Sequence, residues 1–161
     1  MKTYQARQGK VLVVVSAVFS VVCLGITLAT RPWVMRGAGG LSGGVLGWLP
    51  VAVVAGCLPF MIRGYAIAED AILVKRLFWT TRLARAGLQS AEVVPDAMCK
   101  SLRTCGNGGA FSFSGWYWSK ALGHYRAFVT NPNDAVVLRF DKRTVVLSPA
   151  TPDGFVRELN C

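Results

Sequence analysis

Two long runs without a charged side chain lie within the first 62 residues, and they constrain this chain more than any other feature. They cover residues 11–30 and 41–62. At about 1.5 Å per residue, a helix of either length reaches about 30 Å, the thickness of the hydrocarbon core of a bilayer. Pro50 and Pro59 interrupt the second run, but prolines are tolerated in membrane helices. The sequence therefore predicts two membrane-spanning helices.

A cleaved signal peptide is the alternative interpretation of the first run. The run is longer than the apolar core of a signal peptide, which has about 7–15 residues, and no small-residue cleavage motif follows it. A lipoprotein site at Cys23 is disfavoured because Val22 precedes it, where a small residue is expected. We therefore expect residues 1–63 to form an uncleaved two-helix membrane anchor and residues 64–161 to form a separate domain.

The connector between the two runs is short, which predicts an antiparallel helical hairpin. Glycines near the start of the second run are spaced so that helix backbones can approach closely. These helix-packing candidates are Gly40, Gly43, Gly44 and Gly47. They could serve the hairpin itself or a homo-oligomer, and the hairpin is the simpler alternative.

The distribution of positive charge predicts the orientation. The chain has a net charge of +10, and residues 1–63 carry basic side chains but no acidic one. Three basic residues precede the first run and two lie in the connector, whereas four follow the second run up to Arg82. The positive-inside rule then places both termini in the cytoplasm and the hairpin in the cell membrane. Nucleic acid is a disfavoured partner, because no zinc-finger or RNA-binding aromatic motif accompanies the basic residues.

From residue 64 onward, short alternating runs separated by turn residues replace the long apolar runs. This pattern predicts antiparallel strands with no helix between them. Two strands should meet near Glu69-Asp70, and a glycine-rich turn is expected at residues 106–109. In the strand that contains Tyr125, Ala127 and Val129, these three side chains should share one face, because successive strand residues point to opposite faces.

The last residues change to a helical pattern. Thr151 is a suitable N-cap and Pro152 suits the first helical position. Phe155, Val156 and Leu159 then fall on one side of the helix. We expect that side to pack on the sheet.

Strands followed by one terminal helix, preceded by two apolar runs, resemble bacterial pleckstrin-homology (PH) domain proteins with a two-helix membrane anchor. The resemblance rests on YAIAEDAILVKR, LGHYRAFVTNP and TVVLSPATPDGFVREL. It implies a mostly-β fold of the α+β class: two transmembrane helices, then a bent, half-open antiparallel β-barrel capped by a C-terminal helix. The family supplies no catalytic residues to carry over.

Few residues are suited to catalysis or metal binding. His124 is the single histidine, and the spacing of Cys99 and Cys105 does not fit a zinc site, which would also lack a fourth ligand. The two cysteines could form a disulfide in an oxidising compartment and would stay thiols in a reducing one. We therefore expect no enzyme, no metal and no cofactor.

Two segments are candidate binding surfaces. A basic and aromatic segment could face anionic lipid headgroups, or it could be a hairpin with a solvated basic face and a buried Trp. Its residues are Lys75, Arg76, Phe78, Trp79, Arg82 and Arg85. An aromatic set could form a partner groove, although core packing is the default for such residues. This set is Phe111, Phe113, Trp116, Tyr117 and Trp118.

Together these features predict a non-enzymatic binding or scaffolding module anchored at the cytoplasmic face of the membrane. Its partner would be an unidentified protein or peptide, with anionic lipid as an auxiliary ligand. The alternative is a structural or assembly subunit of a larger membrane complex, which would dock through its glycine-rich helix. An enzyme that uses His124 or the two cysteines is the least favoured interpretation.

Overall fold

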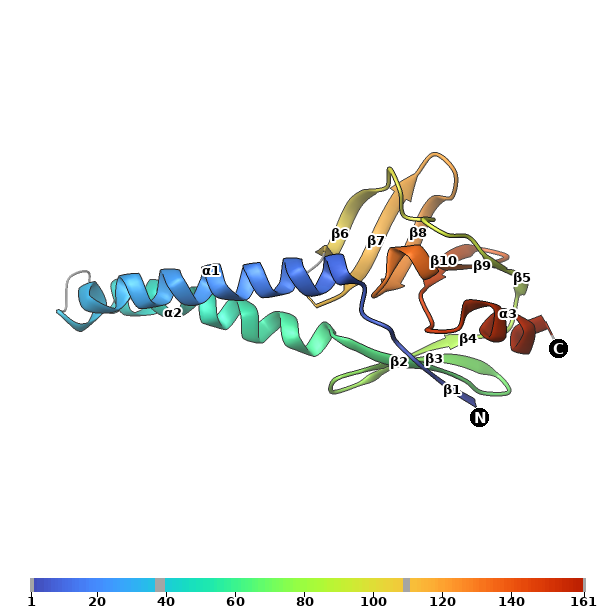
Figure 1. The fold of residues 1–161 in the computed structure, drawn as a ribbon, viewed down its shortest axis with the longest axis horizontal. Helices are drawn as coiled ribbons and strands as arrows, with labels where there is room; N and C mark the ends of the chain where they lie inside the picture. The colour runs from blue at the N-terminus through green and yellow to red at the C-terminus, as the bar shows by residue number, and fades with distance from the viewer. Residues whose placement is uncertain (1, 37–39, 109–110, 161) are drawn as a thin grey trace.

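A computed structural model describes residues 2–36, 40–108 and 111–160 of the chain. Two helices, α1 (Lys10–Met35) and α2 (Gly40–Cys57), lie side by side and project from a β domain. A single 3-10 turn, η1 (Leu58–Phe60), connects α2 to the strand that begins at Ile62. Figure 1 shows that the start of α1 and the end of α2 both lie at the domain.

Helix α1 is apolar along most of its length. Within the described residues, one helical segment, Lys10–Pro32, is long and apolar enough to cross a membrane, with a mean hydropathy of 2.8. Gly47–Phe60 is a shorter apolar helix. Two hydroxyls of α1 bond to its own backbone: those of Ser20 and Thr27 donate to carbonyls four residues earlier. This is how hydroxyl groups are satisfied in an apolar helix.

The first sheet is antiparallel throughout and has the strand order β1-β2-β3-β4. Its strands are β1 (Lys2–Gln5), β2 (Ile62–Ile67), β3 (Ala71–Arg76) and β4 (Thr80–Ala84). The turn predicted near Glu69-Asp70 is confirmed, since it joins β2 to β3. Strand β1 was not expected from the sequence. It pairs with β2 so that Gln5 lies opposite Gly64, on the two sides of the helical hairpin.

The second sheet has the strand order β5-β9-β10-β8-β7-β6. Its strands are β5 (Leu88–Val93), β6 (Leu102–Gly108), β7 (Phe113–Ser119), β8 (Gly123–Val129), β9 (Val136–Phe140) and β10 (Arg143–Leu147). The predicted mostly-β domain is confirmed, but the expectation of a half-open antiparallel barrel was wrong in two respects. The described strands form two separate sheets rather than a barrel, and β8 and β10 pair in parallel. The 3-10 turn η2 (Pro132–Asp134) connects β8 to β9. Strand β9 pairs with β5 rather than with β8, so the edge of β8 is available for pairing with β10.

The glycine-rich turn was also misplaced, because β6 runs through residues 106–108, and Gly109 lies outside the described residues. Gly106 pairs with Gly115 of β7 and has a φ of 114°, which favours glycine. A Cβ atom at Gly106 would lie 2.5 Å from the carbonyl oxygen of Ser114. The glycines therefore allow two strands to approach closely.

The main core lies between the two sheets and is covered at one end by α3 (Pro152–Asn160). Phe155 and Leu159 of α3 are buried and Val156 is half-buried, so the predicted C-terminal helix and its apolar side are confirmed. A second cluster lies on the outer face of the second sheet. There Tyr125, Ala127 and Val129 share one face, as predicted.

Candidate functional site

The two ends of the β domain differ. Helix α3 closes one end, whereas the sheets diverge at the other end, where the helical hairpin joins (Figure 1). A pocket of about 480 Å³ lies at this open end. We call it the arginine pocket. Its principal side chains are Phe60, Arg76, Ser114, Trp116, Arg126 and Phe128. They come from η1, β3, β7 and β8, so the pocket draws on both sheets and on the end of the hairpin.

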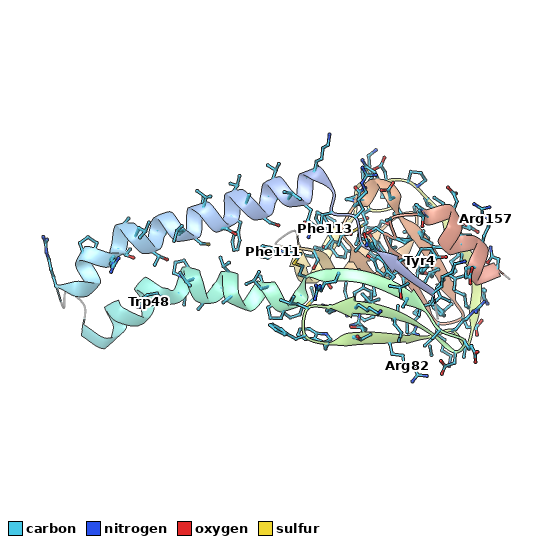
Figure 2. The ribbon with its side chains drawn as sticks, turned by 60° about the horizontal axis from the view of Figure 1, so that its bottom comes forward. Tyr4, Trp48, Arg82, Phe111, Phe113 and Arg157 are labelled. Carbon is cyan, nitrogen blue, oxygen red and sulfur yellow. The ribbon has the colours of Figure 1, made fainter. Side chains whose placement is uncertain are left out.

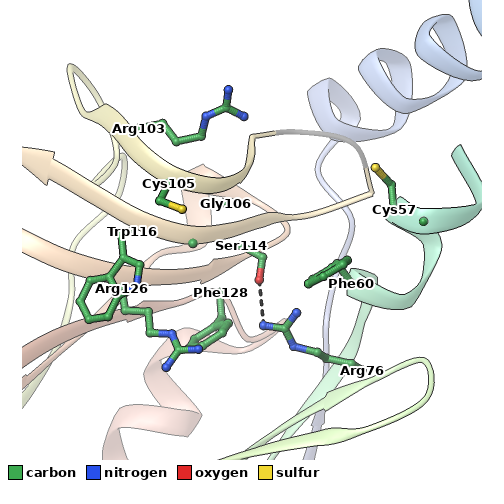
Figure 3. A pocket seen from close by; sticks show the side chains of 12 residues that line it. Cys57, Phe60, Arg76, Arg103, Cys105, Gly106, Ser114, Trp116, Arg126 and Phe128 are labelled. Atoms are coloured by element: carbon green, nitrogen blue, oxygen red, sulfur yellow. Dashed lines mark hydrogen bonds between the residues drawn. The ribbon is translucent and has the colours of Figure 1, made fainter. Parts of the chain in front are cut away.

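Arg76 is the most deeply placed charged group of the pocket. It lies two residues after Val74 and four after Ile72 on β3, so its side chain leaves the same, inward face as these core residues. The residue is only 9% exposed. Its Nη2 donates a hydrogen bond of 2.9 Å to Ser114 Oγ (Figure 3), while its Nε is buried without a partner among the described residues.

Arg126 converges on the same place from the second sheet. It precedes Phe128 by two residues on β8, so both side chains leave the same face of the strand. Its guanidinium carbon lies 4.9 Å from the centre of the Phe128 ring and 5.8 Å from that of Trp116. The guanidinium carbon of Arg76 lies 5.1 Å from the same Phe128 ring. Two cations therefore share one aromatic ring, an arrangement that partly replaces lost hydration.

No acidic residue balances these charges in the pocket. Among the residues that line it in the described structure, none is Asp or Glu. Burial lowers the pKa of Arg76, and the positive charge of Arg126 lowers it further. An arginine nevertheless stays protonated in proteins. Two positive groups without a counter-charge, in a partly enclosed pocket, make it suited to an anion.

Arg103 contributes to the rim rather than to this pair. It lies opposite Tyr117, which belongs to the outer cluster, so its side chain leaves the other face of the sheet. Figure 3 shows it pointing away from Arg76 and Arg126. Cys57 and Cys105 also line the rim and are free thiols. Cys99 is exposed and free as well, so Cys99 and Cys105 are not joined by a disulfide.

The basic and aromatic segment does not form a single surface. Arg76 points into the domain, which corrects its placement on a lipid-facing surface: alternation along β3 sends Lys75 and Arg76 to opposite faces. Phe78 is 75% exposed at the turn between β3 and β4. Trp79 packs edge-on against Phe60, with ring centres 5.5 Å apart. Trp79 therefore lies beside η1, at the end of the hairpin.

The other two arginines of that segment have partners within the domain. Arg82 of β4 forms an exposed ion pair with Asp70, which lies in the β2–β3 turn. Arg85 donates a 2.6 Å hydrogen bond to the carbonyl oxygen of Leu159 in α3. Arg85 therefore lies at the closed end of the domain, away from the arginine pocket.

The five aromatic residues predicted to form a partner groove do not gather in one place. Strand alternation sends Trp116 and Trp118 to one face of β7, while Phe113 and Tyr117 pack with the outer cluster. Phe111 lies against helix α1, where the hairpin meets the domain (Figure 2). The groove prediction was therefore wrong, and Trp116 alone of the five lines the arginine pocket.

Two hydrogen bonds fasten the second sheet to the hairpin beside the pocket. The Phe111 N–H donates to Ser16 Oγ of α1 at 2.9 Å, and Ser112 Oγ donates to the Phe60 carbonyl at 2.9 Å. These contacts fix the position of η1, and with it Phe60, against the start of β7. The hairpin thus forms one wall of the pocket.

The glycines proposed for helix packing are described only in part. Gly47 is buried and borders a groove between α1 and α2 that Leu28 and Trp48 also line. Gly40, Gly43 and Gly44 belong to α2, but their surroundings lie outside the described part of the chain. Their role in packing stays a prediction.

Sequence reasoning did not identify Ser114, Arg126 and Phe128 as site residues. A usable signal was present, because each arginine of the pair stands two positions from a buried apolar residue of its own strand. Val74 precedes Arg76, and Phe128 follows Arg126. An arginine in phase with core residues points inward.

A sequence model of the bacterial PH domain matches residues 63–161, which is more than half of the chain. The match includes almost all of β2, all later strands and α3, and it excludes β1 and the helical hairpin. No curated protein and no solved structure matches the chain significantly.

Proposed function

Because the chain belongs to the bacterial PH domain family, we propose that it is a membrane-anchored binding module without catalytic activity, and that it receives an anionic group in the arginine pocket. The family resemblance inferred from the sequence is thus confirmed. PH domains are in general non-catalytic binding modules, which fits a site built from arginine, serine and aromatic side chains. The position of this uncompensated arginine pair, beside the end of the hairpin, is the observation that carries the proposal.

The exposed side chains of α1 support membrane anchoring. A core helix of a soluble protein is mostly buried, whereas only 17% of the apolar window of α1 is buried. Val14, Val18 and Val21 are each more than half exposed. In water they would form an apolar patch larger than soluble proteins usually present. We propose that α1 and α2 together cross the membrane as a two-helix anchor.

The pairing of β1 with β2 supports a topology in which both ends of the anchor lie on the same side of the membrane. Since β1 belongs to the same sheet as β2, the segment before α1 and the domain after α2 share a compartment. The excess of Lys and Arg at these ends over the connector favours the cytoplasm. We therefore propose a multi-pass protein with both termini in the cytoplasm.

Thiol labelling and fractionation test this proposal. A full-length variant that retains Cys99 as its single cysteine carries an exposed thiol on the domain. In intact cells, a membrane-impermeant reagent should leave it unlabelled until the cells are lysed. The chain should also stay with membranes in high salt and require detergent for release. Release by salt would refute the anchor, and labelling in intact cells would refute the orientation.

A scaffold or assembly subunit is the second candidate. The groove between α1 and α2 near Gly47 supports it, because apolar side chains of both helices line it, including Leu24 and Trp48. A second helix, from another copy or from a protein partner, could pack there. Replacing Gly47 by Leu should then lower the mass of the detergent-solubilised assembly in light scattering, while an unchanged mass would remove this candidate.

A further inference from the structure

We infer that an acidic, partly apolar segment of a partner protein docks on the open face of strands β6, β7 and β8, with one carboxylate between Arg76 and Arg126. This inference rests on the proposed function, because that carboxylate is the anion that the arginine pocket receives. It deepens the function by naming the partner's chemistry and by adding a second contact surface. We call this surface the apolar platform, and it consists of Leu102, Trp116 and Trp118.

The apolar platform lies on the face of the second sheet that also carries Arg126. Leu102 pairs with Trp118, and Trp116 pairs with Arg126, so these four side chains project from one face. Leu102 is 66% exposed and Trp116 is 47% exposed. On the same face, Phe128 is buried in the core between the sheets. The platform is therefore the part of this face that the first sheet leaves uncovered.

The charge around the platform has one sign. Residues 97–133, which include all of β6, β7 and β8, contain no Asp or Glu. The basic residues of this stretch are Lys100, Arg103, Lys120 and Arg126. Protein interfaces bring together potentials of opposite sign, and like charges placed against each other are costly. An acidic segment matches this surface, whereas a second copy of the chain would place the same positive charge against it.

The arginine pair has donors available for a carboxylate. Arg76 Nε is buried without a partner among the described residues, and a buried donor of this kind needs an explanation. Arg126 contacts the rings of Trp116 and Phe128 but has no hydrogen bond or ion pair to any described residue. Guanidinium groups bind carboxylates through paired, charge-assisted hydrogen bonds. The carboxylate of an Asp or Glu would supply acceptors to both arginines.

The direction of the platform favours a protein segment over a lipid. The chain between β6 and β7 meets the hairpin, where the Phe111 N–H donates to Ser16, whereas the turn between β7 and β8 lies away from the hairpin (Figure 1). Leu102 begins β6 and Trp118 lies near the end of β7, so the platform extends from the arginine pocket away from the hairpin. A lipid headgroup in the pocket would leave this apolar surface in water.

An extended segment can occupy both places at once. About six residues in extended conformation span about 20 Å, and successive side chains point in opposite directions. A segment of this length can therefore place an apolar side chain on Trp116 and Leu102 while a neighbouring acidic side chain enters the arginine pocket. Burial of the apolar side chain contributes affinity, and the carboxylate fixes the position of the segment.

Selection from a peptide library tests the inference on the full chain in neutral detergent. The immobilised protein is presented with displayed random peptides, and the bound peptides are sequenced. We expect enrichment of peptides that combine Asp or Glu with an apolar residue, because these match the arginine pair and the platform. Absence of enrichment, or enrichment of peptides without acidic residues, would overturn the inference.

Variants of the arginine pair locate the carboxylate. The affinity of the most enriched peptide is measured by fluorescence anisotropy. Arg126→Gln should weaken binding by about tenfold, and Arg126→Lys should restore it only in part, because lysine lacks the paired donors. Arg139→Gln is the matched control, since it removes an exposed charge of β9 outside the pocket, and should change affinity less than about twofold. Unchanged binding by a folded Arg126→Gln protein would overturn the inference.

A variant of the platform tests the second contact. Leu102→Asn removes an apolar side chain that is mostly exposed, so the domain should fold as before. Peptide affinity should fall by about fivefold, because the apolar contact is lost. Sulfate binding in the arginine pocket, followed by the fluorescence of Trp116 beside Arg126, should not change in this variant. Unchanged peptide affinity would show that the platform is not part of the docking surface.

Sulfate also separates failure of this inference from failure of the proposed function. If sulfate binds in wild type but not in Arg126→Gln, and no acidic peptide is selected, the docking inference is wrong while the pocket still receives an anion. If neither sulfate nor a peptide binds, the proposed function fails as well. Short-chain phosphatidylglycerol is the competitor: displacement of the selected peptide at a concentration below the dissociation constant of the peptide would identify the ligand as a lipid and overturn the inference.

Discussion

The two ends of the β domain are built from the same pair of sheets but filled in opposite ways. At the closed end, Phe155 enters the core and packs edge-on against Tyr4 and Tyr65, with ring centres 5.2 and 6.4 Å away. At the open end, Arg76 and Arg126 occupy the equivalent gap between the sheets. The gap between the sheets is thus filled by an apolar side chain at the closed end and by charged side chains at the open end.

This difference indicates that the side chains of the closed end contribute to stability, whereas those of the open end are candidates for binding. Burying an aromatic side chain such as Phe155 stabilises a fold by about 1.5–3 kcal/mol. Burying a charge is costly unless a partner compensates it, and aromatic rings compensate an arginine only in part. The closed end therefore stabilises the domain, while the open end holds two positive charges that no acidic residue among the described lining residues compensates.

The strongest test of the closed end is Phe155→Ala. Removal of this fully buried ring should lower the free energy of unfolding by about 3–5 kcal/mol, because a cavity opens between α3 and both sheets. Urea unfolding of the full chain in detergent, followed by near-ultraviolet circular dichroism, measures the loss. Arg157→Ala, an exposed change on the same helix, is the control and should have little effect. A loss below about 1 kcal/mol for Phe155→Ala would remove the proposed contrast between the ends.

Tyr65 connects the two ends and should show the next largest effect. Its ring contacts Phe155, while its hydroxyl donates to the Phe128 carbonyl at 2.7 Å and accepts from the Ser148 N–H. Tyr65→Phe leaves these buried groups unpaired and should cost about 1–3 kcal/mol in the same unfolding experiment. A cost near zero would show that water or backbone adjustment satisfies them.

The same tyrosine predicts a dependence on alkaline pH. Burial raises the pKa of Tyr65 above its ordinary value of 10.0, and burial raises the pKa of Tyr117 and Tyr125 in the same direction. Above pH 10.0 the unfolded chain therefore loses phenolic protons that the folded protein retains, so the free energy of unfolding should fall as pH rises. The decline should be less steep in Tyr65→Phe. An identical slope in both proteins would contradict the assignment to Tyr65.

A weaker contribution at the closed end comes from the ion pair between Lys2 of β1 and Glu158 of α3. The Nζ–Oε2 distance is 2.7 Å, but both side chains are substantially exposed. Glu158→Gln should therefore cost less than about 1 kcal/mol, and the cost should diminish at high salt. Glu92→Gln, at an exposed position of β5, controls for the change in net charge. A larger, salt-independent loss would indicate that β1 is held mainly by this pair.

The smallest effect on stability is expected at the open end itself. Arg76→Met retains an apolar side chain of similar length but removes a buried charge, so the free energy of unfolding should be unchanged or slightly higher. Binding of an anion in the arginine pocket, as proposed, should be lost in the same variant. If Arg76→Met destabilised the domain as much as Phe155→Ala, then Arg76 would serve the fold rather than a ligand.

Local signals made much of the fold predictable. The turn residues Glu69-Asp70 and the Thr151-Pro152 start of α3 are encoded in short stretches whose chemistry acts on their own backbone. The alternating faces of β8 follow from its period of two residues. The parallel pairing of β8 and β10 could not be predicted in this way, because it depends on β9 pairing with the distant strand β5.

The site was less predictable because it is assembled from separate strands. In the sequence, Lys75 and Arg76 look like one basic patch, and their opposite orientations appear only when β3 is placed in phase with its core residues. Arg126 meets Arg76 because β3 and β8 face each other across the core, a contact between residues fifty positions apart. Strand β1 gave no signal, since residues 2–5 form a strand only through pairing with β2.

The pairing of β1 with β2 has a further consequence for protein engineering. Viewed as a β-hairpin, these two strands are joined by a connection that contains both helices, and Gln5 and Gly64 are facing residues at its base. Facing residues of an antiparallel pair are the positions that a two-residue Asn-Gly turn joins. Replacing residues 6–63 with such a turn would remove both helices and leave a β-hairpin. The shortened chain would keep Arg76 and Arg126 but would lack Phe60, which lines the arginine pocket.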